Sequence, residues 1–139
     1  MSKTAIIYWS GTGNTEAMAK AIESGMRSAG AEVELLSADK ADAGSLDGFV
    51  KLAFGCPSMG NEELEDSVFA PFFASAEGKL GGKPVALFGS YGWGDGEWMR
   101  TWQERITKSG AILFEQGLIQ QEAPDEAVCS EFGKRFAAV

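Results

Sequence analysis

The fold of this chain is decided by the stretch Thr4-Ala5-Ile6-Ile7-Tyr8-Trp9-Ser10-Gly11-Thr12-Gly13-Asn14-Thr15. Residues 4–9 form a short apolar run, which predicts a buried strand. Residues 10–15 lead from it into a helix over 15–29, where apolar side chains return at helical spacing and Gly30 provides the stop. A buried strand that turns at once into a helix is typical of a parallel α/β sheet.

The rest of the chain repeats this alternation. Apolar runs predict further strands at 32–36, 49–54, 84–89 and within 111–119. Amphipathic stretches predict helices at 64–74, at 97–109 and from 124 onward. Pro71 is expected to bend or break the first of these helices. Lys51 is unexpected in a central strand, so we expect it at the strand's outer end.

The alternation predicts one domain over residues 1–139. Its fold is expected to be α/β, with a doubly wound parallel sheet of five strands in the order 2-1-3-4-5. Helices would cover both faces of the sheet, which gives three layers, α/β/α.

The composition excludes several kinds of site. The chain has 139 residues and no histidine, which rules out Ser-His and Cys-His pairs and histidine-ligated metals. A bound cofactor is therefore expected to carry any chemistry. Cys56 and Cys129 form no CxxC pair, so we expect two reduced thiols and no metal site.

The formal net charge of −8 disfavours nucleic acid and anionic membranes as partners and favours proteins with basic patches. The chain lacks an apolar run of about 18 residues, so no transmembrane helix is expected. Met1-Ser2-Lys3 leads straight into the first strand and leaves no room for a signal peptide. These features predict a cytoplasmic protein.

In a doubly wound sheet the ligand lies outside the carboxyl ends of the strands. The first loop at that edge, 10–15, combines two glycines with three hydroxyls at the start of a helix. Glycine lets backbone N–H groups approach a ligand, and the helix dipole favours an anion. The loop lacks the Lys of a nucleotide-hydrolysing P-loop, so it predicts an uncharged phosphate site. The alternative is a glycine-rich turn with a Thr cap.

The second loop, 56–63, contains the pair Gly60-Asn61, and both residues tolerate positive φ. Such a turn is able to adopt more than one peptide orientation. Met59 beside it is a polarizable apolar group. The alternative interpretation is an acidic surface turn ahead of a helix.

The third loop, 90–99, alternates glycines with Tyr91 and Trp93. Large aromatic side chains on a flexible loop predict a stacking platform for a flat ligand. The alternative is a tryptophan packed under a helix, which the spacing favours for Trp98 and Trp102. Together the loops predict one ligand with a phosphate at one end and a flat ring system at the other.

These loops resemble those of the short-chain, clostridial-type bacterial flavodoxins, and the resemblance covers essentially the whole chain. It rests on IYWSGTGNTE at 7–16, GCPSMGNE at 55–62, LFGSYGWGDG at 87–96 and PDEA at 124–127. It implies a flavodoxin-like fold and non-covalently bound flavin mononucleotide (FMN). It also implies a low-potential one-electron carrier, not an enzyme, that works between semiquinone and hydroquinone in place of ferredoxin.

The resemblance also implies individual roles. The phosphate would be held by the first loop, residues Ser10, Gly11, Thr12, Gly13, Asn14 and Thr15. Met59 and Trp93 would enclose the isoalloxazine ring, and Glu62 would accept a hydrogen bond from flavin N3–H. The Gly60–Asn61 peptide would flip on reduction, so that its carbonyl accepts from N5–H. The remaining cofactor contacts are expected from Pro57, Ser58, Ser90, Tyr91, Gly92, Gly94 and Gln121.

The acidic residues Glu62, Glu63, Glu65 and Asp66 lie at the end of the second loop or just after it, and Asp95 and Glu97 lie in the third, whereas no Lys or Arg lies in any of the three. This pattern predicts a strongly negative second reduction potential and an acidic docking face on a monomer. The family suggests larger redox enzymes as partners, namely ferredoxin- or flavodoxin-dependent reductases, hydrogenase or 2-oxoacid oxidoreductases.

Two alternatives remain open. One is a small FMN-dependent reductase, such as a quinone reductase, or a redox activator of the same fold. The other is a signalling domain such as a phospho-acceptor receiver. A receiver needs an acidic pair after the first strand, where this chain has Trp9-Ser10.

Overall fold

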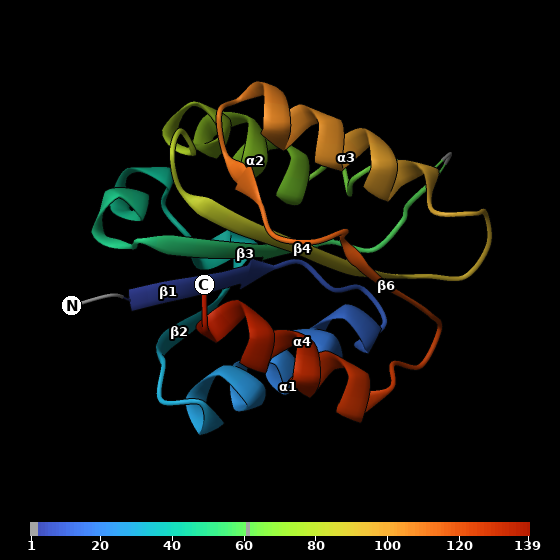
Figure 1. Cartoon of the computed structure of the whole chain (residues 1–139). Helices are drawn as coiled ribbons and strands as arrows, with labels where there is room; N and C mark the ends of the chain where they lie inside the picture. Colours follow the sequence, from blue (N-terminus) through green and yellow to red (C-terminus); the bar gives the residue numbers. More distant parts are fainter. Residues whose placement is uncertain (1–2, 61) are drawn as a thin grey trace.

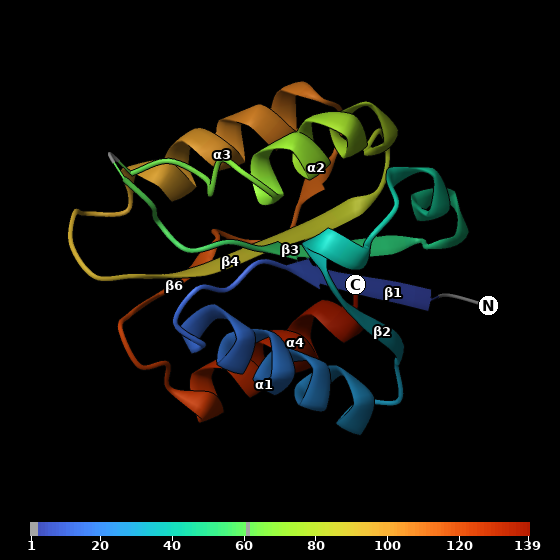
Figure 2. The same cartoon turned by 180° about the vertical axis from the view of Figure 1, so that it is seen from behind.

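The computed structural model describes residues 3–60 and 62–139 and has three layers (Figure 1). The helices α2 (Phe69–Ala76) and α3 (Glu97–Lys108) cover one face of a central sheet. The helices α1 (Asn14–Ser28) and α4 (Glu126–Ala137) cover the other face. The view from behind shows the same separation of the helix pairs (Figure 2). The predicted three-layer α/β fold is confirmed.

The sheet is parallel throughout, and its strands follow the order β2-β1-β3-β4-β5, with β6 also paired to β4. The strands are β1 (Lys3–Tyr8), β2 (Glu32–Ser37), β3 (Lys51–Gly55), β4 (Pro84–Tyr91), β5 (Ile112–Leu113) and β6 (Leu118–Gln121). Short 3₁₀ turns η1 (Ala38–Lys40), η2 (Ala43–Gly48) and η3 (Glu77–Lys79) lie in the connections. The predicted order is confirmed.

The expected fifth strand is two short segments, β5 and β6. Between them the chain leaves the sheet to contact α3, where Gly117 N donates to Gln103 Oε1 at 2.6 Å. A Cβ on Gly117 would lie 2.2 Å from Met99 Sδ, so the backbone itself packs on the helix. Phe114 turns to the other face and packs against Phe132 and Phe136 of α4.

The prediction of a helix from residue 64 bent at Pro71 is wrong, because α2 begins at Phe69. Pro71 is the third residue of this helix, in the first turn, where an N–H has no intrahelical acceptor to lose. The proline therefore neither bends nor breaks the helix. The segment 64–68 is instead a non-helical connection between the second loop and α2.

Lys51 is the first residue of β3 and is buried, paired in register with Thr4 of β1. Its Nζ donates to the carbonyl oxygens of Phe136 at 3.1 Å and Ala137 at 3.0 Å. The amine thus satisfies carbonyl groups at the C-terminal end of α4. Its position at the strand's end agrees with the expectation, but the side chain binds a helix end.

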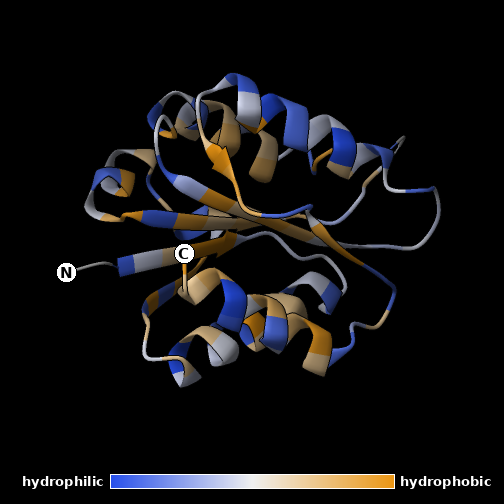
Figure 3. Cartoon of the chain, viewed as in Figure 1, coloured by the Kyte–Doolittle hydropathy of each residue, from blue (hydrophilic) through white to orange (hydrophobic). Residues whose placement is uncertain are grey.

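Apolar side chains fill both spaces between sheet and helices, while hydrophilic residues lie mainly on the outer helix surfaces (Figure 3). The helices α1 and α4 approach closely because Gly25 faces the Ser130 carbonyl and Gly133 faces the Ile22 carbonyl. Cys56 and Cys129 are buried free thiols. Within residues 3–60 and 62–139, no helix is long and apolar enough to cross a membrane.

Candidate functional site

A cavity of about 360 Å³ lies at the carboxyl-end loops of β1, β3 and β4, within the range of about 300–1,000 Å³ typical of small-molecule sites. Its wall combines residues of all three predicted loops with one residue that follows β6. The wall residues are Gly11, Thr12, Asn14, Pro57, Ser58, Met59, Ser90, Tyr91, Gly92 and Glu122. The structure therefore brings together residues that lie far apart in the sequence.

The first loop is closed by the hydroxyl of Ser10. Its Oγ accepts from Gly13 N at 3.1 Å and from Glu16 N at 3.2 Å, at the start of α1. Gly13 has φ 100°, a conformation that an L side chain rarely adopts. Ser10 and Gly13 thus fix the conformation of the turn, while Gly11 and Thr12 line the cavity.

Thr15 lies under the same loop and is buried. Its Oγ1 lies 2.9 Å from Ser90 Oγ and also accepts from Ser90 N at 3.3 Å. Ser90 belongs to β4 and lines the cavity. The two hydroxyls therefore connect the first loop with the third.

The second loop continues the sheet beyond β3, since Ser58 N donates to Ser90 O at 3.0 Å. Met59 and Glu63 then exchange backbone hydrogen bonds of 2.9 and 2.8 Å, which close a tight turn. Gly60, within it, has φ 53°. Asn61 lies outside the described residues, so the flip of the Gly60–Asn61 peptide stays a prediction.

Glu62 does not line the cavity. Its Oε1 accepts from Gly96 N at 3.1 Å and from Glu97 N at 2.9 Å, at the start of α3. A Cβ on Gly94 would lie 2.6 Å from the Glu62 carboxyl carbon, so this glycine makes room for the carboxylate. The carboxylate thus connects the second and third loops, and its role toward flavin N3–H stays a prediction.

The tryptophans divide as the spacing predicts. Trp98 and Trp102 belong to α3 and are buried on its inner side, and Trp98 Nε1 donates to Cys56 O at 3.1 Å. Trp93 is 62% exposed on the glycine-rich loop, although it is not part of the cavity wall. Gln121 is exposed and donates from Nε2 to Gly92 O at 3.4 Å, beside the wall.

Glu122 is the wall residue that the sequence did not reveal. It has φ 54°, and its N–H donates to Tyr91 O at 2.8 Å, which places it beside the third loop. No motif marks this position, because its contact with the cavity depends on the turn that follows β6. The predicted residue next to it, Gln121, was the nearest signal.

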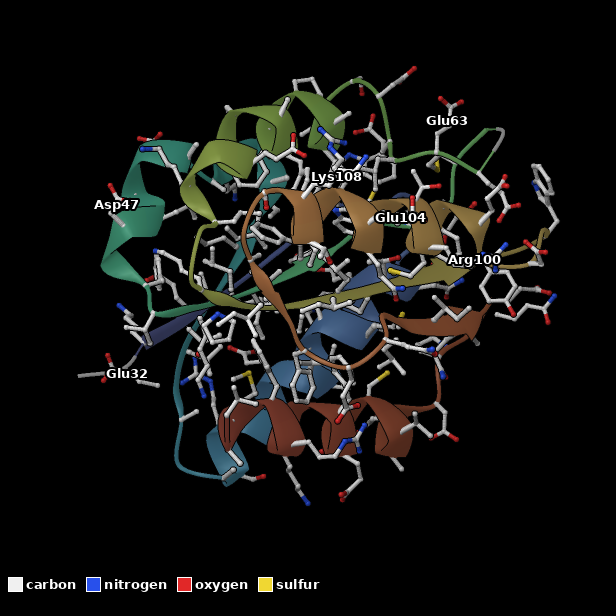
Figure 4. All side chains as sticks on the ribbon, turned by 45° about the horizontal axis from the view of Figure 1, so that its top comes forward. Glu32, Asp47, Glu63, Arg100, Glu104 and Lys108 are labelled. Carbon is white, nitrogen blue, oxygen red and sulfur yellow. The ribbon has the colours of Figure 1, made fainter. Side chains whose placement is uncertain are left out.

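The acidic residues near the site differ in their surroundings: some are paired or buried, and others are exposed. Arg100, one turn into α3, pairs with Asp95 at 3.0 Å and offsets its charge. Glu65 is buried, and its carboxylate is hydrogen bonded toward α2. Glu63 and Glu104 instead point outward on the side of the molecule that carries α2 and α3 (Figure 4).

The residues around the cavity fit FMN. Gly11, Thr12 and Asn14 line it where α1 begins, so backbone and side-chain donors and the helix dipole are available to a phosphate. Met59 and Trp93 are large apolar side chains that are 39% and 62% exposed. A flat ring beside Met59 would remove apolar surface from water, while the role of Trp93 toward the ring stays a prediction.

Comparison with known proteins agrees with the geometry. Residues 6–133 match the family model described as flavodoxin. The chain is 48% identical to a Megasphaera elsdenii flavodoxin over 133 residues, which cover 95% of this chain and 96% of the relative. It is 47% identical to a Clostridium beijerinckii flavodoxin over 136 residues, 96% and 99% of the two chains.

The fold is shared as well. The solution structure of two-electron reduced Megasphaera elsdenii flavodoxin matches with a TM-score of 0.91 at 47% identity, covering 98% of this chain and 99% of that one. These relatives favour neither the small flavin enzyme nor the phospho-acceptor domain. The chain belongs to the flavodoxin family, whose members bind FMN and act as electron carriers for redox enzymes.

Proposed function

We propose that this flavodoxin holds FMN in the cavity, with the phosphate against residues 10–15 and the ring toward Met59 and Trp93. The observation that carries the proposal is the composition of one continuous wall. Thr12 of the first loop, Met59 of the second and Tyr91 of the third all line the same cavity. The donors expected to hold the phosphate and the side chains expected to contact the ring thus belong to one cavity.

Bound FMN supplies one-electron transfer, and the chain supplies binding, orientation and charge. The first loop holds the phosphate through neutral donors. Glu63, at the end of the second loop, and Asp66, just after it, have exposed carboxylates that disfavour additional negative charge nearby. We therefore infer that the second one-electron step has the lower potential and is the working couple.

The partners are inferred to be larger redox enzymes with a basic patch. Supporting observations are the net charge of −8 and the outward-pointing Glu63 and Glu104 (Figure 4). Reductases, hydrogenase and 2-oxoacid oxidoreductases that accept ferredoxin have the required electron-transfer chemistry. Raising the salt concentration should slow electron transfer to such an enzyme. A monomeric state and a cytoplasmic location stay predictions.

The function is tested by anaerobic stepwise reduction of the FMN-loaded protein, followed by its absorbance spectrum. We expect two resolved one-electron steps, the second at the lower potential. A single two-electron step, or a purified chain that fails to take up FMN, would contradict the proposal. Rapid oxidation of NADPH with a quinone as acceptor would point to the reductase instead.

A further inference from the structure

Glu65 is the one acidic side chain that is buried among the described residues, with 4% of it exposed. Its Oε1 accepts from Val68 N at 2.8 Å and Phe69 N at 2.7 Å, at the start of α2. Its Oε2 accepts from Ser67 N at 2.8 Å and from the Ser67 hydroxyl. The carboxylate therefore receives donors that a helix start otherwise leaves without partners.

The carboxyl group stays ionised in this position. Burial by itself would raise the pKa of Glu65, but hydrogen bonds from the Ser67 hydroxyl and from the N–H groups of Phe69, Val68 and Ser67 lower the pKa below its usual value. Exposed Glu63, two residues earlier, points away from the molecule (Figure 4). The acidic run after the second loop thus contains one residue with an internal role.

Glu65 lies just after the second loop and is hydrogen bonded to Cys56, the first residue of that loop. Its N–H donates to Cys56 Sγ at 3.3 Å, and Cys56 N donates to Phe88 O of β4 at 3.1 Å. Burial raises the pKa of the Cys56 thiol to about 12, so the sulfur remains neutral. The backbone carbonyl of Glu65 accepts from Ala70 N of α2 at 2.8 Å.

The flavin-facing turn lies between these fixed ends. Ser58 holds the first end to β4 through Ser90, and Glu65 holds the second end to α2. Between them, Met59 and Glu63 are hydrogen bonded to each other, and Met59 lines the cavity. The position of Met59 relative to the cavity therefore depends on how firmly both ends are held.

We propose that Glu65 is a positioning residue for the flavin site: its buried carboxylate ties the end of the second loop to α2 and so holds Met59 at the cavity. The inference rests on the FMN function proposed above. Glu65 acts through the loop and touches no cofactor itself. A residue that only stabilised α2 would leave cofactor binding and reduction unchanged once the protein is folded.

The test compares Glu65→Gln with Asp66→Asn, which removes the same charge from the neighbouring exposed side chain. Glu65→Gln should weaken FMN binding about tenfold, the effect of losing one charge-assisted hydrogen bond, and should narrow the gap between the two one-electron potentials. Asp66→Asn should change FMN affinity by less than about twofold, because surface charges are screened.

Two further variants separate positioning from stability. Glu65→Asp keeps the charge with a shorter reach, so it should weaken FMN binding by less than the tenfold expected for Glu65→Gln. It carries the test if Glu65→Gln does not fold. Ile106→Val, in the buried part of α3, should lower stability while leaving FMN affinity and potentials unchanged. In the FMN-free protein, amide hydrogen exchange of Met59 and Glu63 should accelerate in the two Glu65 variants but not in Asp66→Asn or Ile106→Val.

The outcomes are distinct. If the unaltered chain fails to bind FMN, the proposed function is wrong. If the unaltered chain binds FMN and both Glu65 variants retain its affinity, potentials and exchange rates, the positioning role is wrong. Equal shifts in Glu65→Gln and Asp66→Asn would assign the effect to charge alone and would overturn the inference.

Discussion

The hydroxyl oxygens of Thr15 and Ser90 lie 2.9 Å apart in the buried interior, where they connect the first loop with the third. Replacing Thr15 by Val removes one hydroxyl at nearly constant shape. Ser90 then loses the partner of its hydroxyl and of its N–H. We expect the free energy of unfolding of the FMN-free protein to fall by about 1–3 kcal/mol, measured by urea denaturation.

The control is the double variant Thr15→Val with Ser90→Ala. It removes both hydroxyls, so less polar surface is left without a partner, and the combined loss should be smaller than the sum of the single losses. Losses that simply add would show that the two hydroxyls are not coupled.

Gly94→Ala should weaken FMN binding through Glu62. Gly94 has φ 90°, and a new Cβ would lie 2.6 Å from the Glu62 carboxyl carbon. The carboxylate must then move away from Gly96 and Glu97. Gly82→Ala is the matched control, because it has φ 78° with nothing within 4 Å. Both variants should lose about 1–2 kcal/mol of stability from backbone strain, and FMN titration should detect weaker binding in Gly94→Ala alone.

Acid should remove the stabilisation that Glu65 provides. Because hydrogen bonds lower the pKa of the folded-state carboxyl, its contribution is present above the unfolded-state value of about 4.3 and is lost as the pH falls through the folded-state pKa. The difference between the urea midpoints of the unaltered chain and of Glu65→Gln should therefore be constant around neutral pH and should shrink as the pH falls below about 4.3. A difference that persists unchanged into acid would rule out the ionised carboxylate as its source.

Trp93→Ala should weaken FMN binding by about twofold to twelvefold, since an aromatic pair contributes about 0.5–1.5 kcal/mol beyond area burial. Titration of FMN fluorescence against the FMN-free protein measures this directly. Val50→Ala is the control, because Val50 is 46% exposed and lies before β3, at the end opposite the cavity loops. Unchanged affinity in Trp93→Ala would remove Trp93 from the site.

Lys51→Met should lower stability by about 1–2 kcal/mol without affecting FMN affinity. The substitution removes both hydrogen bonds from Nζ to the carbonyls at the end of α4. Lys134→Met, an exposed change within α4, should have little effect on either quantity. Thermal unfolding together with FMN titration checks both halves of the prediction.

The sequence predicted the sheet well for a physical reason. Both β1 and β3 are covered by helices on two faces, so residues such as Ile6 and Phe54 appear in continuous apolar runs. The same rule about carboxyl ends of parallel strands located the three loops around the cavity. These features are local in the sequence, or follow from strand order.

Features that depend on contacts between distant segments could not be predicted. The start of α2 is set by the Glu65 carboxylate, which is an unusual cap, so Pro71 alone gave the wrong helix bounds. The contact of Glu62 with Glu97 spans two loops and has no signature in either. The cavity position of Glu122 likewise follows from the turn after β6 and not from its residue type.

The cavity wall contains no Lys or Arg among its described residues, although the chain carries a net charge of −8. Ion pairs between Lys or Arg and the phosphate would weaken with rising salt, and so would docking to an enzyme with a basic patch. With the phosphate held by neutral donors, as proposed, only docking to the proposed basic enzyme would have that dependence. Ionic strength would then dissociate the carrier from its enzyme while the flavin stays in place, so exchange of partners and retention of the cofactor would be controlled by different forces.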